Sequence, residues 1–151
     1  MPDLRDLYQE VILDHQKRPR NFRKLDVANR TADGYNPLCG DKVSVYLDVE
    51  DGMVRDIGFQ GSGCAISTAS ASMMTESLKG KTEAEAYALF HRFHDLVTGK
   101  LRPQEDSASL GKLVVFAGVR DYPVRVKCAT LAWHTLRAAL EGDNKKPVAT
   151  E

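Results

Sequence analysis

Three cysteines, Cys39, Cys64 and Cys128, are the residues of this sequence whose type and spacing point to chemistry. They are far apart along the chain and no two form a CxxC pair, so spacing supports neither a zinc ribbon nor a thioredoxin-like motif. An odd number of cysteines without a secretory signal also argues against a disulfide framework. Spacing alone is equally compatible with buried thiols that act as small hydrophobic residues. The segments around each cysteine therefore decide the matter.

Cys39 lies in the segment NPLCGD (36–41), where proline and glycine indicate a loop just before a strand. Residues i and i+2 of an extended segment point to the same side, so Cys39 and Asp41 can face a single ion. Gly40 between them allows the backbone to come close to that ion. On its own, Asp41 is more typical of a turn-capping aspartate, so the case depends on the other two cysteines.

Cys64 and Cys128 are both expected near the start of a helix. Cys64 follows the segment GSG (61–63) and opens a helix, where backbone N–H groups and the helix dipole favour a thiolate. Cys128 lies early in the last helix, three residues after Arg125, which shares its face and also favours the thiolate. Both positions also suit cysteines that only pack. Two glycines directly before a helix usually serve a close approach or an unusual turn, which favours the chemical role for Cys64.

Taken together, one Cys–Asp loop and two cysteines at helix starts predict a metal site at one end of a sheet. The predicted ligands are three thiolates and one carboxylate, from Cys39, Cys64, Cys128 and Asp41. Such a tetrahedral set suits Zn²⁺. Because thiolates are soft ligands and carboxylate is hard, the metal is expected to be held yet exchangeable. The anionic ligands outweigh the charge of one Zn²⁺, so Arg125, with Lys127 or Lys42, is expected to offset the excess.

The four histidines are weaker metal candidates. His91 and His94 are three residues apart on a predicted helix and so share a face. Phe90 and Phe93 define the buried stripe of that helix, which favours a position for both histidines at its solvent edge. The residues near each cysteine give no support to a Cys–His pair of the protease type.

The strands are predicted in the first half of the chain. Alternating apolar and polar residues predict a strand over 43–49. The turn signal at 50–52 then predicts a return strand over 53–60, which completes a hairpin. Residues 25–35 are ambiguous, with an edge strand expected around Val27–Thr31.

Helices are expected at the N-terminus and through the second half of the chain. A capping-box pattern at Thr82 and Glu85 opens one helix, and a proline in the first turn opens the last. The expected helices span 3–16, 65–79, 82–97, 110–119 and 121–140, with a loop over 98–109. This order predicts an α+β fold, a small antiparallel sheet with helices packed on one face.

Length and composition limit the class of protein. A chain of 151 residues fits a single domain, expected over 1–141, with a polar tail over 142–151. The 21 basic and 21 acidic residues cancel, which argues against a nucleic-acid partner bound by charge. The longest apolar run, 113–119, is too short to span a membrane. Without a visible secretory signal, a cytoplasmic location is expected. The sequence leaves a homodimer open.

Four segments resemble the NifU-like/IscU family of iron–sulfur cluster assembly proteins. They are LYQEVILDHQKRPRNF (7–22), NPLCGD (36–41), GSGCAISTASASMMTESLKGK (61–81) and PVRVKCATLAW (123–133). The middle two match in both spacing and residue type. The resemblance implies the SufE/NifU-like fold, in agreement with the α+β prediction. It also places the family's ligands on Cys39, Asp41, Cys64 and Cys128.

Within that family, the sequence resembles the SufU branch more than the IscU scaffolds. IscU-type proteins carry a histidine immediately before the last cysteine, where this chain has Lys127. The long stretch between Val97 and Val119, and Arg125 three residues before Cys128, also resemble SufU. In that branch the site holds zinc, and the protein accepts sulfur from a PLP-dependent cysteine desulfurase of the SufS type.

The resemblance leads to one favoured hypothesis and two alternatives. The favoured one is a zinc-binding sulfur relay that works with a cysteine desulfurase rather than as a stand-alone enzyme. Cys39 then accepts the persulfide sulfur, Arg125 supports it, and downstream cluster-assembly or acceptor proteins receive it. In the first alternative, the same positions bind iron or assemble a [2Fe–2S] cluster. In the second, zinc only stabilises a non-catalytic interaction domain.

Overall fold

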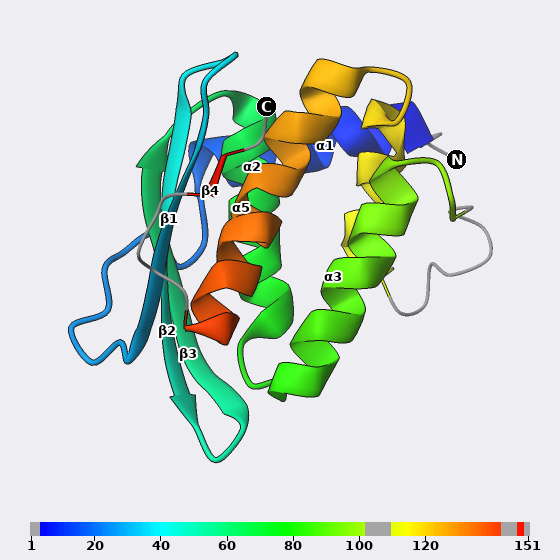
Figure 1. Cartoon of the computed structure of the whole chain (residues 1–151). Coiled ribbons are helices and arrows are strands. Elements are labelled where there is room, and N and C mark those ends of the chain that lie inside the picture. The colour runs from blue at the N-terminus through cyan, green and yellow to red at the C-terminus, as the bar shows by residue number, and fades with distance from the viewer. Residues whose placement is uncertain (1–3, 102–109, 143–147, 150–151) are drawn as a thin grey trace.

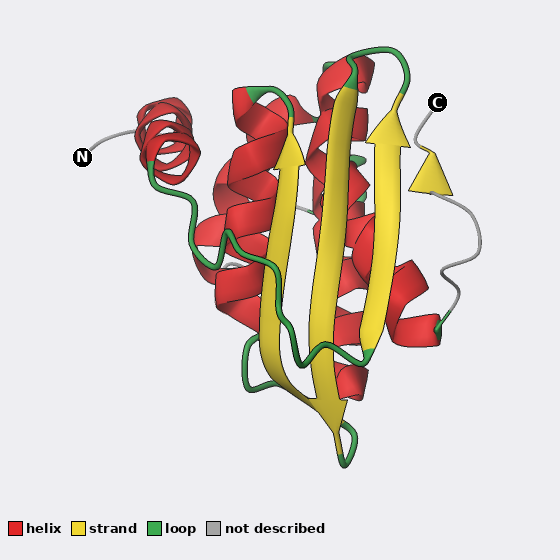
Figure 2. Cartoon of the chain, turned by 90° about the vertical axis from the view of Figure 1, so that its left-hand side faces the viewer, coloured by secondary structure: helices red, strands yellow, loops and turns green. Residues whose placement is uncertain are grey.

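The chain folds into a sheet with helices on one face, seen edge-on in Figure 1 and from the sheet side in Figure 2. This computed structural model describes residues 4–101, 110–142 and 148–149. The elements are α1 (Leu4–Lys17), β1 (Arg30–Asn36), β2 (Asp41–Glu50), β3 (Met53–Ser62), α2 (Ala65–Leu78), α3 (Glu83–Val97), the 3₁₀-helix η1 (Gly111–Val119), α5 (Pro123–Glu141) and β4 (Val148–Ala149). The predicted α+β architecture is confirmed.

The sheet has the strand order β3-β2-β1-β4, and its three long strands are antiparallel. The hairpin between β2 and β3 turns at Asp51 and Gly52, which both have positive φ, 55° and 75°. A two-residue type I′ turn requires this backbone, and Asp-Gly is a favoured pair for it. The inward-facing residues of β2 are buried, as the alternating pattern predicted: Val43, Val45, Leu47 and Val49.

The first strand begins later than the sequence predicted. We expected an edge strand around Val27–Thr31, but β1 starts at Arg30, and the Val27 side chain is 69% exposed. The side chain of Asn29 explains the late start. Its Nδ2 donates to the Val49 carbonyl and its Oδ1 accepts from Val49 N. The Asn29 side chain therefore makes the hydrogen bonds to Val49 that a longer β1 would make with its backbone.

The expected polar tail contains a strand. Val148 and Ala149 form β4, which pairs in parallel with Gly34 and Tyr35 of β1. The edge of β1 offers this segment backbone hydrogen-bonding groups, so its polar composition does not prevent a strand. Most of the loop predicted over 98–109 lies outside the described residues.

Two helix layers cover the inner face of the sheet. α2 and α5 pack directly on the strands, and α3 packs one layer further out, against α5 and η1 (Figure 1). Small buried residues such as Ala69 and Ala71 bring α2 close to its neighbours. Between α3 and α5, the Phe93 ring stacks on Trp133 with ring centroids 4.5 Å apart. Within the described residues, no helix has the length and apolar character needed to cross a membrane.

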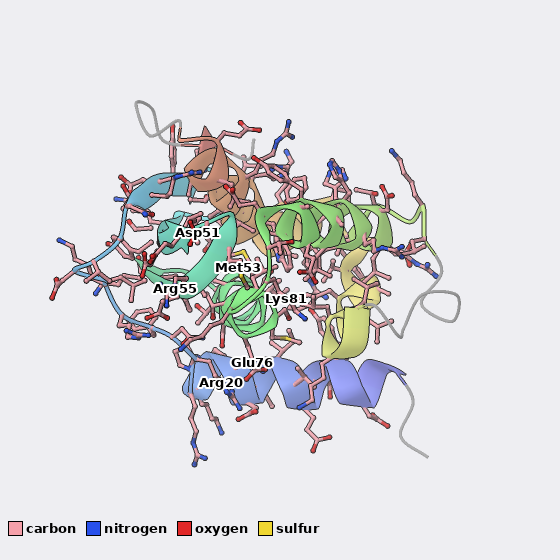
Figure 3. All side chains as sticks on the ribbon, turned by 90° about the horizontal axis from the view of Figure 1, so that it is seen from below. Arg20, Asp51, Met53, Arg55, Glu76 and Lys81 are labelled. Atoms are coloured by element: carbon pink, nitrogen blue, oxygen red, sulfur yellow. The ribbon has the colours of Figure 1, made fainter. Side chains whose placement is uncertain are left out.

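The two ends of the sheet differ in what they carry. At the hairpin end, Val54 N donates to the Lys81 carbonyl and Gly80 N donates to the Val54 carbonyl. These bonds fasten the link between α2 and α3 to β3, and Met53 lies beside Lys81 in the view of this end in Figure 3. The β1–β2 loop and the starts of α2 and α5 lie at the opposite end, at the top of Figure 1.

Candidate metal centre

The three cysteines meet at this second end of the sheet. The sulfurs of Cys39 and Cys128 are 3.5 Å apart. Cys39, Asp41 and Cys128 each offer a ligand atom, and these atoms lie within 4.8 Å of one another. Cys64 lies outside that group of three, but its Sγ is 3.7 Å from Asp41 Oδ2. All four residues singled out in the sequence are therefore neighbours in the fold.

A tight loop after β1 positions Cys39. The Asn36 carbonyl accepts from Cys39 N at 3.2 Å and from Gly40 N at 2.8 Å. Asn36 Oδ1 also accepts from Leu38 N at 3.1 Å, which is an Asx turn. Gly40 has a φ of 72°, a backbone conformation that glycine adopts without steric cost. The loop leaves Cys39 exposed at its tip.

Asp41, the first residue of β2, is held under the start of α2. Its side chain is buried, and its Oδ1 accepts from Cys64 N at 2.9 Å. A Cβ atom on Gly63 would lie 2.7 Å from that same oxygen, and one on Gly61 would collide with the Lys42 carbonyl. The two glycines of GSG serve a close approach, as the sequence predicted.

Cys64 is the N-cap residue of α2, and its Sγ accepts from Ser67 N at 3.4 Å. The prediction that Cys64 opens a helix is therefore confirmed. Backbone N–H groups at this position stabilise negative charge on the sulfur.

Cys128 lies in the second turn of α5 and is buried, with 4% of its surface exposed. Asn36 Nδ2 donates to its sulfur at 3.9 Å. Burial raises the pKa of the Cys128 thiol, and the adjacent Cys39 thiol and the charge of Cys64 raise it further. A bound cation opposes this effect, because metal binding requires the thiolate.

Arg125 lies in the first turn of α5, three residues before Cys128. Its guanidinium is 4.5 Å from the centre of the Tyr122 ring, and it lines a groove of about 410 Å³ together with Tyr8 and Ile66. Burial raises the pKa of Tyr8, while the charge of Arg125 lowers it and that of Cys64 raises it. The supporting role of Arg125 stays a prediction.

His91, His94 and His134 lie on another part of the molecule, between α3 and α5, and His15 lies on α1 against Ser72 of α2. His91 is exposed and His94 half-buried, and both rings contact Phe90, with centroids 5.3 and 6.1 Å away. Their position agrees with the predicted solvent edge. Within the described ranges, Cys39, Asp41 and Cys128 form the one group of three or more side chains close enough to share a metal.

Sequence reasoning missed Asn36, which contacts both the Cys39 loop and the Cys128 sulfur. The Asn-Pro dipeptide marks the start of a turn and could have drawn attention to it. The resulting centre offers soft sulfur donors and one carboxylate oxygen. This donor set fits Zn²⁺, which accepts both kinds of ligand.

Comparison with known proteins gives a consistent result. Residues 7–129 match the model of the NifU-like N-terminal domain. The iron–sulfur cluster assembly scaffold protein IscU of Streptococcus pyogenes is 41% identical over 138 residues, 91% of this chain and 85% of that protein. The zinc-dependent sulfurtransferase SufU of Bacillus subtilis is 41% identical over 145 residues, 94% of this chain and 97% of that protein.

A solved structure from Fervidobacterium islandicum, described as an iron–sulfur cluster assembly scaffold protein for the SUF system, superposes with a TM-score of 0.82. It is 37% identical to this chain, and the match covers 89% of this chain and 96% of that one. Fold, sequence and the grouping of the cysteines thus agree, and the chain belongs to the NifU-like N-terminal domain family.

Proposed function

We propose that this protein acts in iron–sulfur cluster assembly as a zinc-binding sulfur acceptor of the SufU type. The observation that carries the proposal is the convergence of Cys39, Asp41 and Cys128 within 4.8 Å, with Cys64 against Asp41. The 41% identity to a zinc-dependent sulfurtransferase over 94% of the chain supports it. The partner that supplies the sulfur is a PLP-dependent cysteine desulfurase.

The four converging side chains, of Cys39, Asp41, Cys64 and Cys128, would hold the zinc ion. When bound, zinc keeps cysteine sulfurs in the thiolate form at neutral pH. Cys128 is buried in α5, whereas Cys39 and Cys64 are both exposed. Of the two exposed cysteines, Cys39 lies at the tip of a loop and Cys64 caps α2.

In the proposed transfer, the Cys39 thiolate attacks the outer sulfur of the desulfurase persulfide. A bond forms between Cys39 Sγ and that sulfur, and the sulfur–sulfur bond of the desulfurase breaks. The desulfurase cysteine leaves as a thiolate, and Cys39 becomes the persulfide, so no external oxidant or reductant is needed. Arg125, close to the start of α5, supports the negative sulfur, and a downstream assembly protein takes the sulfur next.

The test is desulfurase turnover with and without this chain, followed by mass spectrometry of the chain. The wild-type chain is expected to stimulate turnover and to gain the mass of one sulfur atom on the peptide that carries Cys39. Cys39→Ala is expected to abolish both effects, whereas Leu38→Ala, a change at the neighbouring exposed residue, should keep the sulfur acceptor. Full stimulation by Cys39→Ala contradicts the assigned role.

A cluster scaffold is the second candidate function, because the chain is equally identical to a scaffold protein named IscU. Here the iron and sulfur of a [2Fe–2S] cluster are the cargo of the same four residues. Lys127 favours the relay. IscU-type scaffolds have a histidine at this position, whereas lysine is a poor metal ligand at neutral pH. Reconstitution with iron and sulfide separates the two functions. A lasting visible absorption spectrum supports the scaffold, and one tightly bound zinc without a lasting cluster supports the relay.

The zinc-stabilised interaction domain makes a different prediction, namely that chelation unfolds the chain. The hydrophobic core of the described residues is formed by the sheet and the helices behind it, and of the three cysteines only Cys128 is buried. We therefore expect the chelated protein to keep its far-ultraviolet circular dichroism and to melt at a lower temperature, because zinc binds only the folded state. Loss of the circular dichroism on chelation favours the interaction domain.

A further inference from the structure

The three sulfurs of the metal centre differ in the N–H groups that contact them. Cys64 Sγ accepts from Ser67 N at 3.4 Å, at the start of α2. Cys128 Sγ accepts from Asn36 Nδ2 at 3.9 Å, inside the protein. For Cys39, the side-chain contact seen in the described part of the chain is with the Cys128 sulfur, 3.5 Å away.

The Asn36 side chain is completely buried, with 0% of its surface exposed. Its Oδ1 is occupied by Leu38 N, and its backbone carbonyl by Cys39 N and Gly40 N. These bonds fix the orientation of the amide and direct Nδ2 at the Cys128 sulfur. A buried amide donor needs a partner, and this sulfur provides it.

An N–H group directed at a sulfur has a specific chemical effect. It stabilises negative charge on the thiolate and withdraws electron density from it. Partners of this kind orient metal ligands and tune the strength of their bonds to the metal. A sulfur with such a donor is a better retained ligand and a weaker nucleophile than a sulfur without one.

We propose that Asn36 is a positioning residue that keeps Cys128 in its ligand position, which leaves Cys39 as the sulfur that reacts. The inference rests on the proposed function and deepens it, because it explains how three cysteines in one centre divide two tasks. Asn36 contacts both cysteines but differently: it shapes the loop of Cys39 and donates to the sulfur of Cys128.

The test is a double-mutant cycle on zinc affinity, measured on the full chain by competition with a chelator. Asn36→Ser is neutral, can still accept a hydrogen bond from Leu38 N, and is too short to reach the Cys128 sulfur. We expect it to lower zinc affinity by about 10- to 100-fold. A loss of the same size is expected when Asn36→Ser is added to Cys39→Ala, and little or no loss when it is added to Cys128→Ser.

Asn29→Ser is the matched control. Asn29 also uses both ends of its amide, on the backbone of Val49, but it lies at the other end of β1 from the cysteines. We expect Asn29→Ser to lower the stability of the fold and to leave zinc affinity unchanged.

A second variant protects the test in case Asn36→Ser folds poorly. Asn36→Asp keeps the shape of the side chain and the acceptor for Leu38 N but has no N–H to give. In the cobalt-substituted protein, its sulfur-to-cobalt charge-transfer bands should move to lower energy, because the Cys128 sulfur then faces a carboxylate oxygen in place of an N–H donor. The Asn29→Ser protein should keep the wild-type bands.

Two outcomes would overturn the inference. One is unchanged zinc affinity in Asn36→Ser together with unchanged bands in Asn36→Asp. The other is an effect that disappears with Cys39→Ala and survives with Cys128→Ser, which would mean that Asn36 acts only through the Cys39 loop. None of these measurements involves the desulfurase. A coupled Asn36–Cys128 pair in a protein that accepts no sulfur therefore counts against the proposed function alone.

Discussion

Polar side chains gather against α2 in two regions, the metal centre and the contact between α1 and α2. The two regions differ in how hydrogen-bond donors and acceptors are paired. At the contact, Ser72 Oγ accepts from Arg20 N at 2.8 Å and lies 2.7 Å from His15 Nδ1. Thr75 Oγ1, one turn further, donates to the Arg20 carbonyl and accepts from Asn21 Nδ2. In this region each donor is paired with an acceptor, and the half-buried Arg20 also lies beside Glu76 (Figure 3).

At the metal centre, by contrast, the sulfurs and the carboxylate mainly face one another. Groups that become anionic when they lose their protons repel each other at such distances unless a cation lies between them. The comparison shows how to separate two kinds of buried polar cluster. A cluster whose donors and acceptors match serves the fold, and a cluster of converging acceptors is prepared for a ligand.

The largest effect is expected when the metal centre is blocked without removing a ligand. Gly63→Ala places a Cβ 2.7 Å from Asp41 Oδ1, so the Asp41 carboxylate or the start of α2 must move. We expect zinc affinity to fall by about 100-fold, because a shifted ligand is lost to the metal. Chelator competition measures the loss.

Gly118→Ala is the control, because a Cβ there would make an ordinary 3.4 Å contact with the Tyr8 ring. It should leave zinc affinity unchanged. Equal affinities for Gly63→Ala and the wild-type protein would mean that zinc binding does not depend on the packing of Asp41 against the start of α2, and the contrast between the two regions would then lose its main support.

The next effect concerns the other region and should affect stability only. Ser72→Ala removes the acceptor of Arg20 N and the partner of His15, which leaves a part-buried N–H group and a buried ring without that partner. We expect the free energy of unfolding to drop by about 1–3 kcal/mol, as measured by denaturant titration, with zinc affinity unchanged.

Ser77→Ala, on the same helix, is the matched control. Ser77 Oγ donates to the Met73 carbonyl, which already accepts within the helix, so its loss should change stability by less than about 0.5 kcal/mol. If Ser72→Ala also weakens zinc binding substantially, the two regions are coupled and do not serve the fold and the metal separately.

The sequence predicted the fold well where the pattern is local. The hairpin of β2 and β3, the capping box of α3 and the proline that starts α5 were all visible, because each depends on residues close in the chain. The start of β1 and the presence of β4 were not, because both depend on pairing between segments far apart in the sequence.

The site followed the same division. The four converging residues were found through their local motifs, since a loop with Cys39 and Asp41 and a cysteine at a helix start are local features. The role of Asn36 and the distances between the sulfurs depend on how β1, α2 and α5 meet. The partner of His15, Ser72, lies 57 residues away in the sequence, so the local pattern around His15 does not reveal it.

The smallest expected effect is a pH dependence of stability from His15. Burial lowers the pKa of His15, and the charge of Arg20 lowers it further. Because Ser72 Oγ already accepts from Arg20 N, its own proton is available to His15 Nδ1, which favours the neutral ring. In the unfolded chain the ring takes up its proton near its ordinary pKa, so the unfolded state binds more protons as the pH falls below about 6.5. Stability is therefore retained above that pH and decreases below it, until the pH passes the lower pKa of the folded state.

Denaturant titrations of the chelated protein at about pH 7.5 and about pH 5.5 measure this effect apart from metal binding. His15→Gln should lose less stability on acidification than the wild-type protein, and the difference should be smaller than the loss caused by Ser72→Ala.

Burial also lowers the pKa of His134, which acts in the same direction, so the wild-type slope contains both contributions. An equal slope in His15→Gln and the wild-type protein would mean that the α1–α2 contact accommodates a charged imidazole as readily as water does. The pairing of donors with acceptors would then not explain why α1 stays in place.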